Sequence, residues 1–502
     1  MNLINDILQT IEEITEEKPN LPIFQETQKT YTYRDLKEKS DCIASYILDH
    51  LGQECRPIVV YGKQNFAMMA TMLGCSKAGR PYIPIDEHTP SERLQTILDV
   101  AKPELVLYNE EFRDDVTGVA VKSVHSLRGV EKDAYPGLDL DDVYYIIFTS
   151  GTTGIPKGVE ITHRNLLSFV NWALSDFNLD LHERFLLQAP FSFDLSVMSL
   201  YPALVSKGTL VPLTKDVIND FQKLFQVLPK LDLSVWVSTP SFMDICLMQP
   251  TFDAKHLPSI KHFLFCGEEL THKTAQELRN RFPEADLFNT YGPTEATVAV
   301  SAINITQQVL DQNKRLPIGY VKDDTKVIIF DDGKEVSAGQ EGEIIIAGPS
   351  VSCGYLNNPE KTEQAFFEYE GMPAYRTGDL GYFGEHQLLY YAGRKDFQVK
   401  LHGYRMELED IDHHLNDVKY VKQATVVPKY KNHKVEKLIA YVVPSGDDFA
   451  KDYERTKAIK KAMAETVMDY MIPQKFIYVE KLPLTSNGKI DRKGLINEVN
   501  AT

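Results

Sequence analysis

Short apolar segments that alternate with longer amphipathic stretches constrain the fold of this sequence more than any other feature. Residues 57–61 and 82–85 are rich in β-branched and aromatic residues, and a helical pattern runs between them as far as Ala78. Similar runs recur, each followed by a polar loop marked by Gly or Pro, at 143–148, 234–237, 262–265 and 286–288. Because this alternation is typical of βαβ units, we predict an α/β fold with doubly wound, largely parallel sheets.

The pattern changes in the last third of the chain. From Gly342 onward the sequence reads as β structure punctuated by glycines, and after Asp396 it reads as the strands and helices of a small α+β unit. A chain of 502 residues is too long for one hydrophobic core. We therefore predict a large N-terminal domain of several subdomains, residues 1–395, and a small mobile C-terminal domain, residues 396–502.

The charge distribution breaks at the same place. The net charge of the whole chain is −17, but residues 397–502 hold 18 Lys and Arg against 15 Asp and Glu, a balance of +3. The preceding 396 residues therefore carry −20. An acidic chain lacks the basic footprint that binding to nucleic acid needs, so we expect no nucleic-acid partner.

Other features of the sequence indicate a cytoplasmic protein. The six cysteines form no CxxC pair and no cluster with histidines at metal-ligand spacing. The first residues run into the acidic stretch 12–17, which is unlike the basic and then apolar start of a signal peptide. No apolar run approaches the roughly 18 residues that a membrane-spanning helix needs, so we expect no membrane insertion.

Residues 150–158, with the sequence SGTTGIPKG, have the chemistry of a phosphate-binding loop. They follow a predicted strand and supply glycines whose backbone can approach an anion, hydroxyl groups that can donate to phosphate oxygens, and the cation Lys157. The glycine spacing differs from the GxxxxGK[ST] pattern, and Gly158 follows the lysine. A Gly/Thr loop alone is commonly only a turn, so its weight depends on the motifs that accompany it.

Four further motifs follow in a fixed order: NTYGPTE at 289–295, YRTGD at 375–379, GRKD at 393–396 and NGK at 487–489. Together with the loop they resemble the adenylate-forming superfamily of acyl-CoA synthetases, luciferases and nonribosomal peptide adenylation domains. The resemblance runs from residues 31–36 to Lys489. Within the superfamily, residues 191–198, 264–268 and 400–407 are most similar to the stand-alone D-alanine–D-alanyl carrier protein ligases.

This resemblance implies a ligase that uses ATP and Mg²⁺ to activate D-alanine as an adenylate. The acyl group would pass to the phosphopantetheine thiol of a separate, acidic carrier protein, for D-alanylation of lipoteichoic acid in the cell wall. Glu295 would help to hold Mg²⁺, Tyr291 would stack on adenine and Asp379 would accept the ribose hydroxyls. The resemblance assigns the rest of the nucleotide site to Thr149, Ser150, Thr152, Thr153, Lys157, Asn289, Thr290, Gly292, Pro293, Thr294, Tyr391 and Arg394.

Asp194 favours an amino acid as the substrate. It lies in an apolar stretch where an unpaired carboxylate would be costly to bury, and the resemblance supplies the α-ammonium of the substrate as its partner. The alternative is that Asp194 caps the helix that begins at residue 195. The other pocket positions are Leu195, Met198, Ser238, Cys266, Thr290 and Val298; Met198 and Cys266 would fill space and leave room for a small side chain.

Three residues are assigned to the movement of the small domain. By resemblance, Lys489 is the catalytic lysine, which contacts the substrate carboxylate and the nucleotide during adenylation. Rotation about the hinge Asp396 would then remove Lys489 and bring up the loop around Gly403, which would leave room for the phosphopantetheine arm. A plain hairpin turn is the alternative for Gly403.

Other functions share most of these residues. A short-chain acyl-CoA synthetase, or an adenylation enzyme for glycine, serine or L-alanine, would use the same nucleotide site, and Asp194 argues against the first of these. A nucleotide-binding scaffold protein without activity could keep the fold. Such a protein could have lost Lys489, Glu295 or Asp379, and all three are present.

Overall fold

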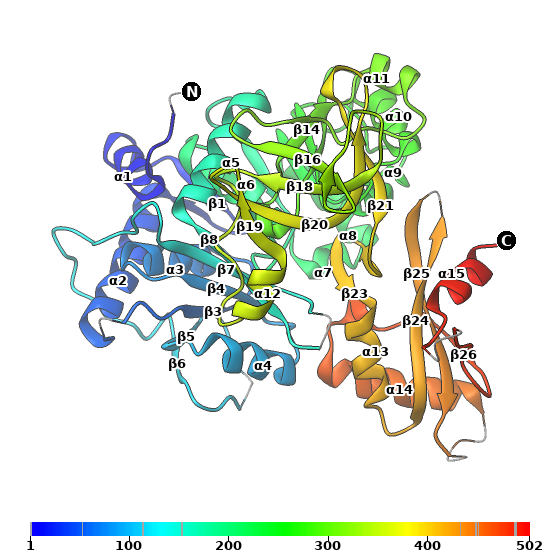
Figure 1. The fold of residues 1–502 in the computed structure, drawn as a ribbon. Helices are drawn as coiled ribbons and strands as arrows, with labels where there is room; N and C mark the ends of the chain where they lie inside the picture. The colour runs from blue at the N-terminus through cyan, green and yellow to red at the C-terminus, as the bar shows by residue number, and fades with distance from the viewer. Residues whose placement is uncertain are drawn as a thin grey trace.

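The apolar runs of the N-terminal part build two largely parallel sheets (Figure 1). The structure is a computed structural model that describes residues 3–52, 54–112, 115–151, 154–431, 433–446, 449, 451–485 and 489–501. The first sheet has the strand order β6-β5-β3-β4-β7-β8. Its strands are β3 (Ile58–Gly62), β4 (Tyr82–Asp86), β5 (Leu105–Tyr108), β6 (Ala120–Ser123), β7 (Val143–Thr149) and β8 (Lys157–Thr162). Because β8 runs antiparallel to β7, the predicted phosphate loop is the reversal between them.

The second sheet has the order β15-β14-β13-β12-β11-β9-β10-β1-β2. Its strands are β1 (Pro22–Gln25), β2 (Thr30–Thr32), β9 (Arg184–Leu187), β10 (Thr209–Pro212), β11 (Val235–Ser238), β12 (His262–Phe265), β13 (Asp286–Tyr291), β14 (Ser301–Asn304) and β15 (Tyr320–Val321). The strands from β1 to β13 in this order are parallel. Ligands of such sheets bind beyond the carboxyl ends of the strands, and Cys266 and residues 292–295 follow two of those ends.

Helices cover both faces of these sheets, as the doubly wound prediction requires. Side chains alternate along a strand, so Val60 of β3 joins the core shared by the two sheets while Val59 faces the other side. The helices of the shared core are α1 (Ile7–Glu17), α2 (Tyr33–His50), α3 (Phe66–Lys77), α5 (His163–Asp176) and α6 (Leu195–Val205). The outer faces are covered by α4 (Ser91–Ala101), α8 (Phe221–Val227), α9 (Pro240–Leu247), α10 (His272–Arg281) and α11 (Gln307–Gln312).

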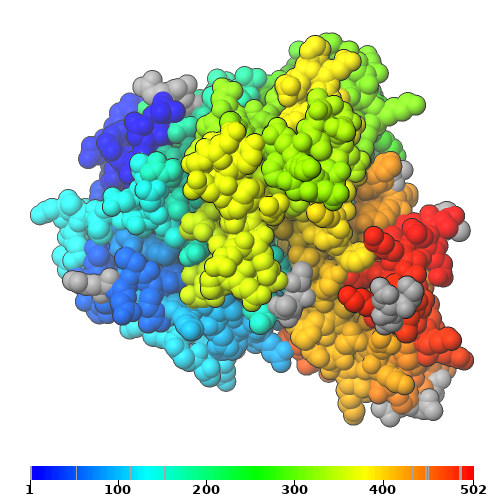
Figure 2. All heavy atoms as spheres, viewed as in Figure 1, coloured from blue at the N-terminus to red at the C-terminus, as the bar shows by residue number. Residues whose placement is uncertain are grey.

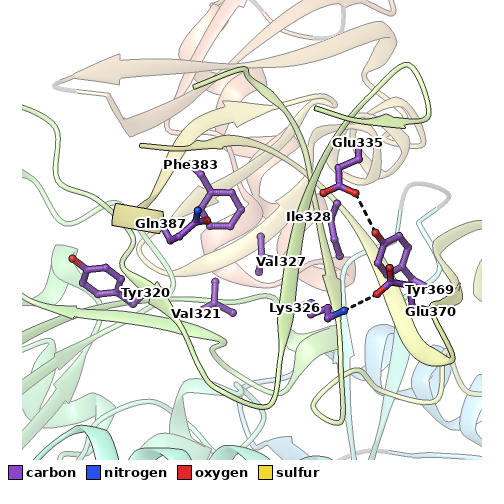
Figure 3. A pocket seen from close by; sticks show the side chains of 10 residues that line it. All are labelled: Tyr320, Val321, Lys326, Val327, Ile328, Glu335, Tyr369, Glu370, Phe383 and Gln387. Carbon is purple, nitrogen blue, oxygen red and sulfur yellow. Dashed lines mark hydrogen bonds and ion pairs between the residues drawn. The ribbon is translucent and has the colours of Figure 1, made fainter. Parts of the chain in front are cut away.

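A third, antiparallel sheet follows, which agrees with the glycine-punctuated sequence pattern. Its strands are β16 (Lys326–Asp331), β17 (Lys334–Glu335), β18 (Gly342–Ala347), β19 (Phe366–Tyr369), β20 (Met372–Phe383) and β21 (Leu389–Arg394), with α12 (Pro359–Ala365) beside them. An open cavity of about 420 Å³ lies on this sheet (Figure 3). Four of its polar side chains pair with one another, through the ion pair of Lys326 with Glu370 and the hydrogen bond from Tyr369 to Glu335. Among the residues that the structure describes, none of those predicted for the site lines this cavity.

The C-terminal part, orange to red in Figures 1 and 2, lies at one side of the molecule. It has hydrophobic clusters of its own, which are built from residues between 397 and 499. A hairpin, β22 (Gln398–Leu401) and β23 (Tyr404–Glu407), precedes the sheet β24 (Val421–Lys431), β25 (Lys434–Pro444) and β26 (Lys475–Tyr478). The helices are α13 (Leu408–Asn416), α14 (Asp452–Thr466) and α15 (Arg492–Asn500), and α14 packs against α4. The boundary near residue 396 stays a prediction.

Short helical turns complete the secondary structure: α7 (Lys215–Ile218), Leu228–Lys230, Thr294–Ala296, Glu385–Gln387 and Asp469–Met471. In the part of the chain that the structure describes, no helix combines the length and the apolar character that crossing a bilayer would require.

Candidate active site

A cleft of about 710 Å³ lies between the carboxyl edge of the second sheet and the C-terminal part of the chain. Motifs that are far apart in the sequence line it together, namely residues 266–270, 289–292, 391–400 and 433–435. Its volume is in the range of small-molecule sites, which are commonly about 300–1,000 Å³. The predicted nucleotide residues Asn289, Thr290, Tyr291, Gly292, Tyr391 and Arg394 and the predicted substrate residue Cys266 all line the cleft.

Asp379 is held by two donors at one end of this cleft. The phenol of Tyr291 donates to Asp379 Oδ2 at 2.6 Å, and Arg394 Nη1 donates to Asp379 Oδ1 at 2.8 Å. The same guanidinium binds the carboxylate of Asp396 through Nε at 2.8 Å and Nη2 at 2.5 Å. Arg394 therefore ties the predicted ribose acceptor to the predicted hinge residue.

The backbone between β13 and β14 is tightly constrained. A Cβ on Gly292 would lie 2.5 Å from Ala299 Cα, so only glycine fits there. Thr297 and Val298 have φ angles of 57° and 70°. A β-branched residue in this left-handed region costs about 1–3 kcal/mol of strain, which the surrounding structure must offset. Strain of this size is commonly found at functional sites, and Val298 lies in the predicted substrate pocket.

The predicted substrate residues Asp194, Met198, Cys266 and Val298 are buried, and Cys266 also lines the cleft. Met198 and Val298 belong to one hydrophobic core with Cys266, whose Sγ lies 3.5 Å from the carbonyl oxygen of Val298. Asp194 is 9% exposed and precedes α6, but its side chain makes no capping hydrogen bond there. Its Oδ2 instead accepts a hydrogen bond from Thr294 Oγ1 at 2.6 Å. Burial raises the pKa of this carboxyl.

The predicted phosphate and metal residues form a buried charged cluster. Glu295 has no exposed surface, and the phenol of Tyr355 donates to its Oε1 at 2.8 Å. Lys157 Nζ lies 4.9 Å from the centre of the Tyr355 ring. Burial acts to raise the pKa of Glu295, but the charges of Arg405 and Lys157 outweigh it and lower this pKa to about 2. A buried, ionised carboxylate is a suitable ligand for Mg²⁺, which is commonly held by one or two carboxylates and substrate phosphates.

The hairpin of residues 398–407 enters this cluster from the C-terminal part. Arg405 Nη1 donates to Glu295 Oε2 at 2.6 Å. Ser150 Oγ donates to the carbonyl oxygen of Arg405 at 3.1 Å and accepts from the amide of Glu407 at 3.3 Å. His413 of α13 also lies beside the predicted phosphate loop, since a Cβ on Gly154 of that loop would lie 2.6 Å from the His413 ring.

Gly403 is both a turn residue and a contact residue. It follows His402 in the two-residue connection between β22 and β23, and both have positive φ angles, of 85° and 54° respectively. A Cβ on Gly403 would lie 2.2 Å from Thr239 Cγ2. The hairpin-turn alternative is therefore correct as a description of the backbone, and the pantetheine role stays a prediction.

Lys489 does not lie at the site. It is exposed, and its backbone exchanges hydrogen bonds with Thr485, at 3.3 Å and 2.7 Å. The predicted phosphate residues Thr152 and Thr153 lie outside the described residues. The structure thus has the hairpin, and not Lys489, beside Ser150 and Glu295. The resemblance predicts this arrangement for the step in which Lys489 has left and the loop around Gly403 has approached, and the roles of these residues stay predictions.

Sequence reasoning assigned no role to several residues that contact the site, although three of them belong to the recognised stretch 400–407. Tyr355, Arg405 and Glu407 had no assigned role, and neither did Lys400, which lines the cleft with Cys266. One signal was available for the hairpin: Arg405 and Glu407 flank Met406, so their side chains share the face opposite to a core residue.

Two matches cover most of the chain. Residues 11–356 match the AMP-binding enzyme family, and residues 410–489 match the AMP-binding enzyme C-terminal domain. The chain therefore belongs to the AMP-binding enzyme family, whose adenylate-forming members use ATP.

Individual relatives of the chain have a more specific name than the family does. The chain is 53% identical to the D-alanine–D-alanyl carrier protein ligase of Lactiplantibacillus plantarum, over 99% of this chain and 100% of the relative. It is 46% identical to the protein of the same name from Listeria monocytogenes, with the same coverage. A solved NRPS protein that contains adenylation and PCP domains is 26% identical, with a TM-score of 0.84, and the match covers 98% of this chain and 84% of that one.

Proposed function

We propose that the chain is an AMP-forming ligase that activates D-alanine as D-alanyl-adenylate and transfers it to the phosphopantetheine thiol of a separate carrier protein. One observation carries the proposal: the carboxylate of Asp194 is buried at the start of α6, the helix that carries Met198, and its charge acts on Cys266, whose Sγ contacts the carbonyl of Val298. A buried carboxylate suits a substrate ammonium. The full-length relatives named D-alanine–D-alanyl carrier protein ligase support the choice of acid and acceptor.

ATP fits the residues of the cleft. Tyr291, Asp379 and Arg394 would hold the adenosine, and Ser150 and Lys157 would hold the phosphates. Glu295 would hold Mg²⁺, which supplies positive charge against the leaving pyrophosphate. The carboxylate oxygen of the amino acid bonds to the α-phosphorus, the bond to the bridging oxygen breaks, and pyrophosphate leaves. The thiol sulfur then bonds to the acyl carbon, AMP leaves with its oxygen, and the thiol proton passes to solvent.

The remaining assignments belong to the same proposal. The small domain would begin near Asp396 and rotate about it, with Lys489 in the site for adenylation and Gly403 beside the pantetheine arm for transfer. The acceptor would be an acidic carrier protein, because the small domain is more basic than the rest of the chain. The product would serve D-alanylation of lipoteichoic acid from the cytoplasm.

Exchange of labelled pyrophosphate into ATP tests the proposal directly. D-alanine should support the fastest exchange when L-alanine, glycine and a fatty acid are each measured separately as alternative substrates. Faster exchange with glycine or L-alanine would point to another amino-acid ligase, and a preference for the fatty acid would point to an acyl-CoA synthetase. No exchange with any acid would contradict the enzymatic function itself.

A further inference from the structure

The segment of residues 352–356 follows β18 of the third sheet and runs beside β8 of the first sheet. The Leu356 amide attaches it to β8, because it donates to the carbonyl oxygen of Gly158 at 2.8 Å. The Ser352 amide donates to the carbonyl oxygen of Glu295 at 2.9 Å. One segment therefore ties β8, whose first residue is the predicted phosphate cation, to the turn that carries the predicted metal ligand.

Tyr355 of this segment contacts both of those residues with its side chain. Its phenol donates to Glu295 Oε1 at 2.8 Å, and the centre of its ring lies 4.9 Å from Lys157 Nζ. This distance is within the range of a cation–π interaction, which is stronger where water is excluded. Tyr355 is only 5% exposed, and Glu295 is completely buried. A single buried side chain therefore joins the two groups that would meet Mg²⁺ and the phosphates.

The surroundings of Tyr355 fix the position of its hydroxyl. The ring meets the ring of Phe366 of β19 edge-on, with centres 5.3 Å apart and planes at 76°. The Tyr355 amide donates to Thr362 Oγ1 of α12 at 3.0 Å. Burial raises the pKa of the phenol well above its ordinary value, so the hydroxyl stays protonated and can donate at neutral pH.

The two carboxylate oxygens of Glu295 have different kinds of partner. Oε1 accepts from Tyr355, which lies in the predicted large domain. Oε2 accepts from Arg405 Nη1 at 2.6 Å, and Arg405 lies in the predicted small domain. Only the contact with Tyr355 would therefore persist when the small domain moves. Glu295 would then present Oε2 to a metal ion while Oε1 stays held.

We propose that Tyr355 is a positioning residue for adenylation: its hydroxyl orients Glu295 so that Oε2 binds Mg²⁺, and its ring holds the ammonium of Lys157 beside the phosphates. Carboxylates that bind metals commonly depend on such hydrogen-bond partners, and loss of a partner costs about 10- to 100-fold in metal affinity. The inference rests on the proposed adenylation site, but it does not depend on which acid is activated.

Calorimetric binding of ATP to the full-length protein, with and without Mg²⁺, separates the two contacts of Tyr355. Tyr355→Phe removes only the hydroxyl, so metal-free ATP binding should stay as in wild type while the gain in affinity from Mg²⁺ falls about tenfold. Tyr355→Leu also removes the ring, so it should in addition weaken metal-free ATP binding about threefold. Tyr33→Phe, which removes a buried phenol that donates to the carbonyl oxygen of Leu204 at 2.9 Å near the end of α6, is the matched control and should bind ATP as wild type does.

Pyrophosphate exchange at varied Mg²⁺ provides a second readout. Tyr355→Phe should raise KM for Mg²⁺ about tenfold and lower kcat at saturating Mg²⁺ by less than about threefold, a separation that a purely structural role would not produce. An unchanged gain from Mg²⁺ in Tyr355→Phe, or an equal loss of ATP affinity with and without the metal, overturns the inference. If ATP binds as expected but no acid supports exchange, only the proposed function is contradicted.

Discussion

Asp194 is the residue on which the choice of an amino acid depends. Asp194→Asn keeps the shape of the side chain and its hydrogen bond with Thr294, but removes the charge. Because breaking a buried ion pair costs about 3–5 kcal/mol, kcat/KM for D-alanine should fall about 10²- to 10⁴-fold in pyrophosphate exchange. Thr294→Val is a useful companion, since it removes the donor and keeps the carboxylate. A loss of less than threefold in Asp194→Asn would rule out the ammonium contact.

The same residue gives a pH prediction. Burial raises the pKa of Asp194 above its ordinary value of 3.8, and only the ionised form can pair with an ammonium. Activity should therefore be present at high pH and fall as the pH decreases through this raised pKa. The acid limb of kcat/KM should disappear in Asp194→Asn, and its persistence there would assign it to another group.

Met198 should limit the size of the substrate side chain. It is fully buried in α6, in the same core as Cys266 and Val298. Met198→Ala should lower the free energy of unfolding by about 2–5 kcal/mol because it leaves a cavity. The same cavity should raise the relative activity with D-2-aminobutyrate, compared with D-alanine. A matched substitution in the same helix, Leu200→Ala, should destabilise the protein without changing this preference.

Individual residues of the site differ in how far the sequence predicts their structure. The burial of Asp194 was predictable, because its neighbours in the sequence are apolar, and its role toward the substrate stays a prediction. Val298 was assigned to the pocket by resemblance, but its left-handed backbone could not be foreseen, because β-branched residues disfavour that region. It follows from the close approach of Gly292 to Ala299, which is a tertiary contact.

At the scale of elements, the turn of the hairpin makes a specific prediction. In Gly403→Ala the new Cβ would clash with Thr239 Cγ2, and the φ of 85° disfavours alanine. Adenylation should be retained, while transfer to the carrier thiol should slow by at least about tenfold. Thr239→Ser removes Cγ2 and keeps the hydroxyl that caps α9, so the double variant should recover part of the lost rate. No difference between the single and double variants would contradict the proposed clash.

Sequence periodicity located strands better than it located contacts between elements. The runs at 143–148 and 262–265 correspond to β7 and β12, because short apolar runs rich in β-branched and aromatic residues have few other stable conformations. The hairpin was part of a recognised stretch, yet its position beside Ser150 is set by how the C-terminal part packs. No local pattern encodes that packing.

At the scale of the whole molecule, charge and domain arrangement belong together. The residues after the predicted hinge carry a net positive charge, whereas the residues before it carry a net negative charge. An acidic partner would therefore be attracted to the predicted small domain and not to the large one. If the carrier protein is acidic, its transfer rate at low carrier concentration should fall as ionic strength rises, since complementary charge mainly accelerates encounter. Adenylation, measured in parallel, should change little, and a transfer rate that is insensitive to salt would contradict the electrostatic contribution.

Lys489 allows a test of whether the small domain takes up two arrangements, one with the hairpin at the site and one with Lys489 there. It is exposed here while the hairpin occupies the site, so its predicted role requires the small domain to move. Lys489→Ala should reduce adenylation by at least about 10²-fold, because a cation at the reacting oxygens is lost. Transfer from supplied D-alanyl-adenylate should stay near the wild-type rate, since we propose that this step uses the arrangement seen here, with Lys489 away from the site. Lys481→Ala, another exposed lysine nearby, is the control and should affect neither step. An equal loss of both half-reactions in Lys489→Ala would mean that the lysine acts in one common arrangement, and the rotation about Asp396 would then have no support from this residue.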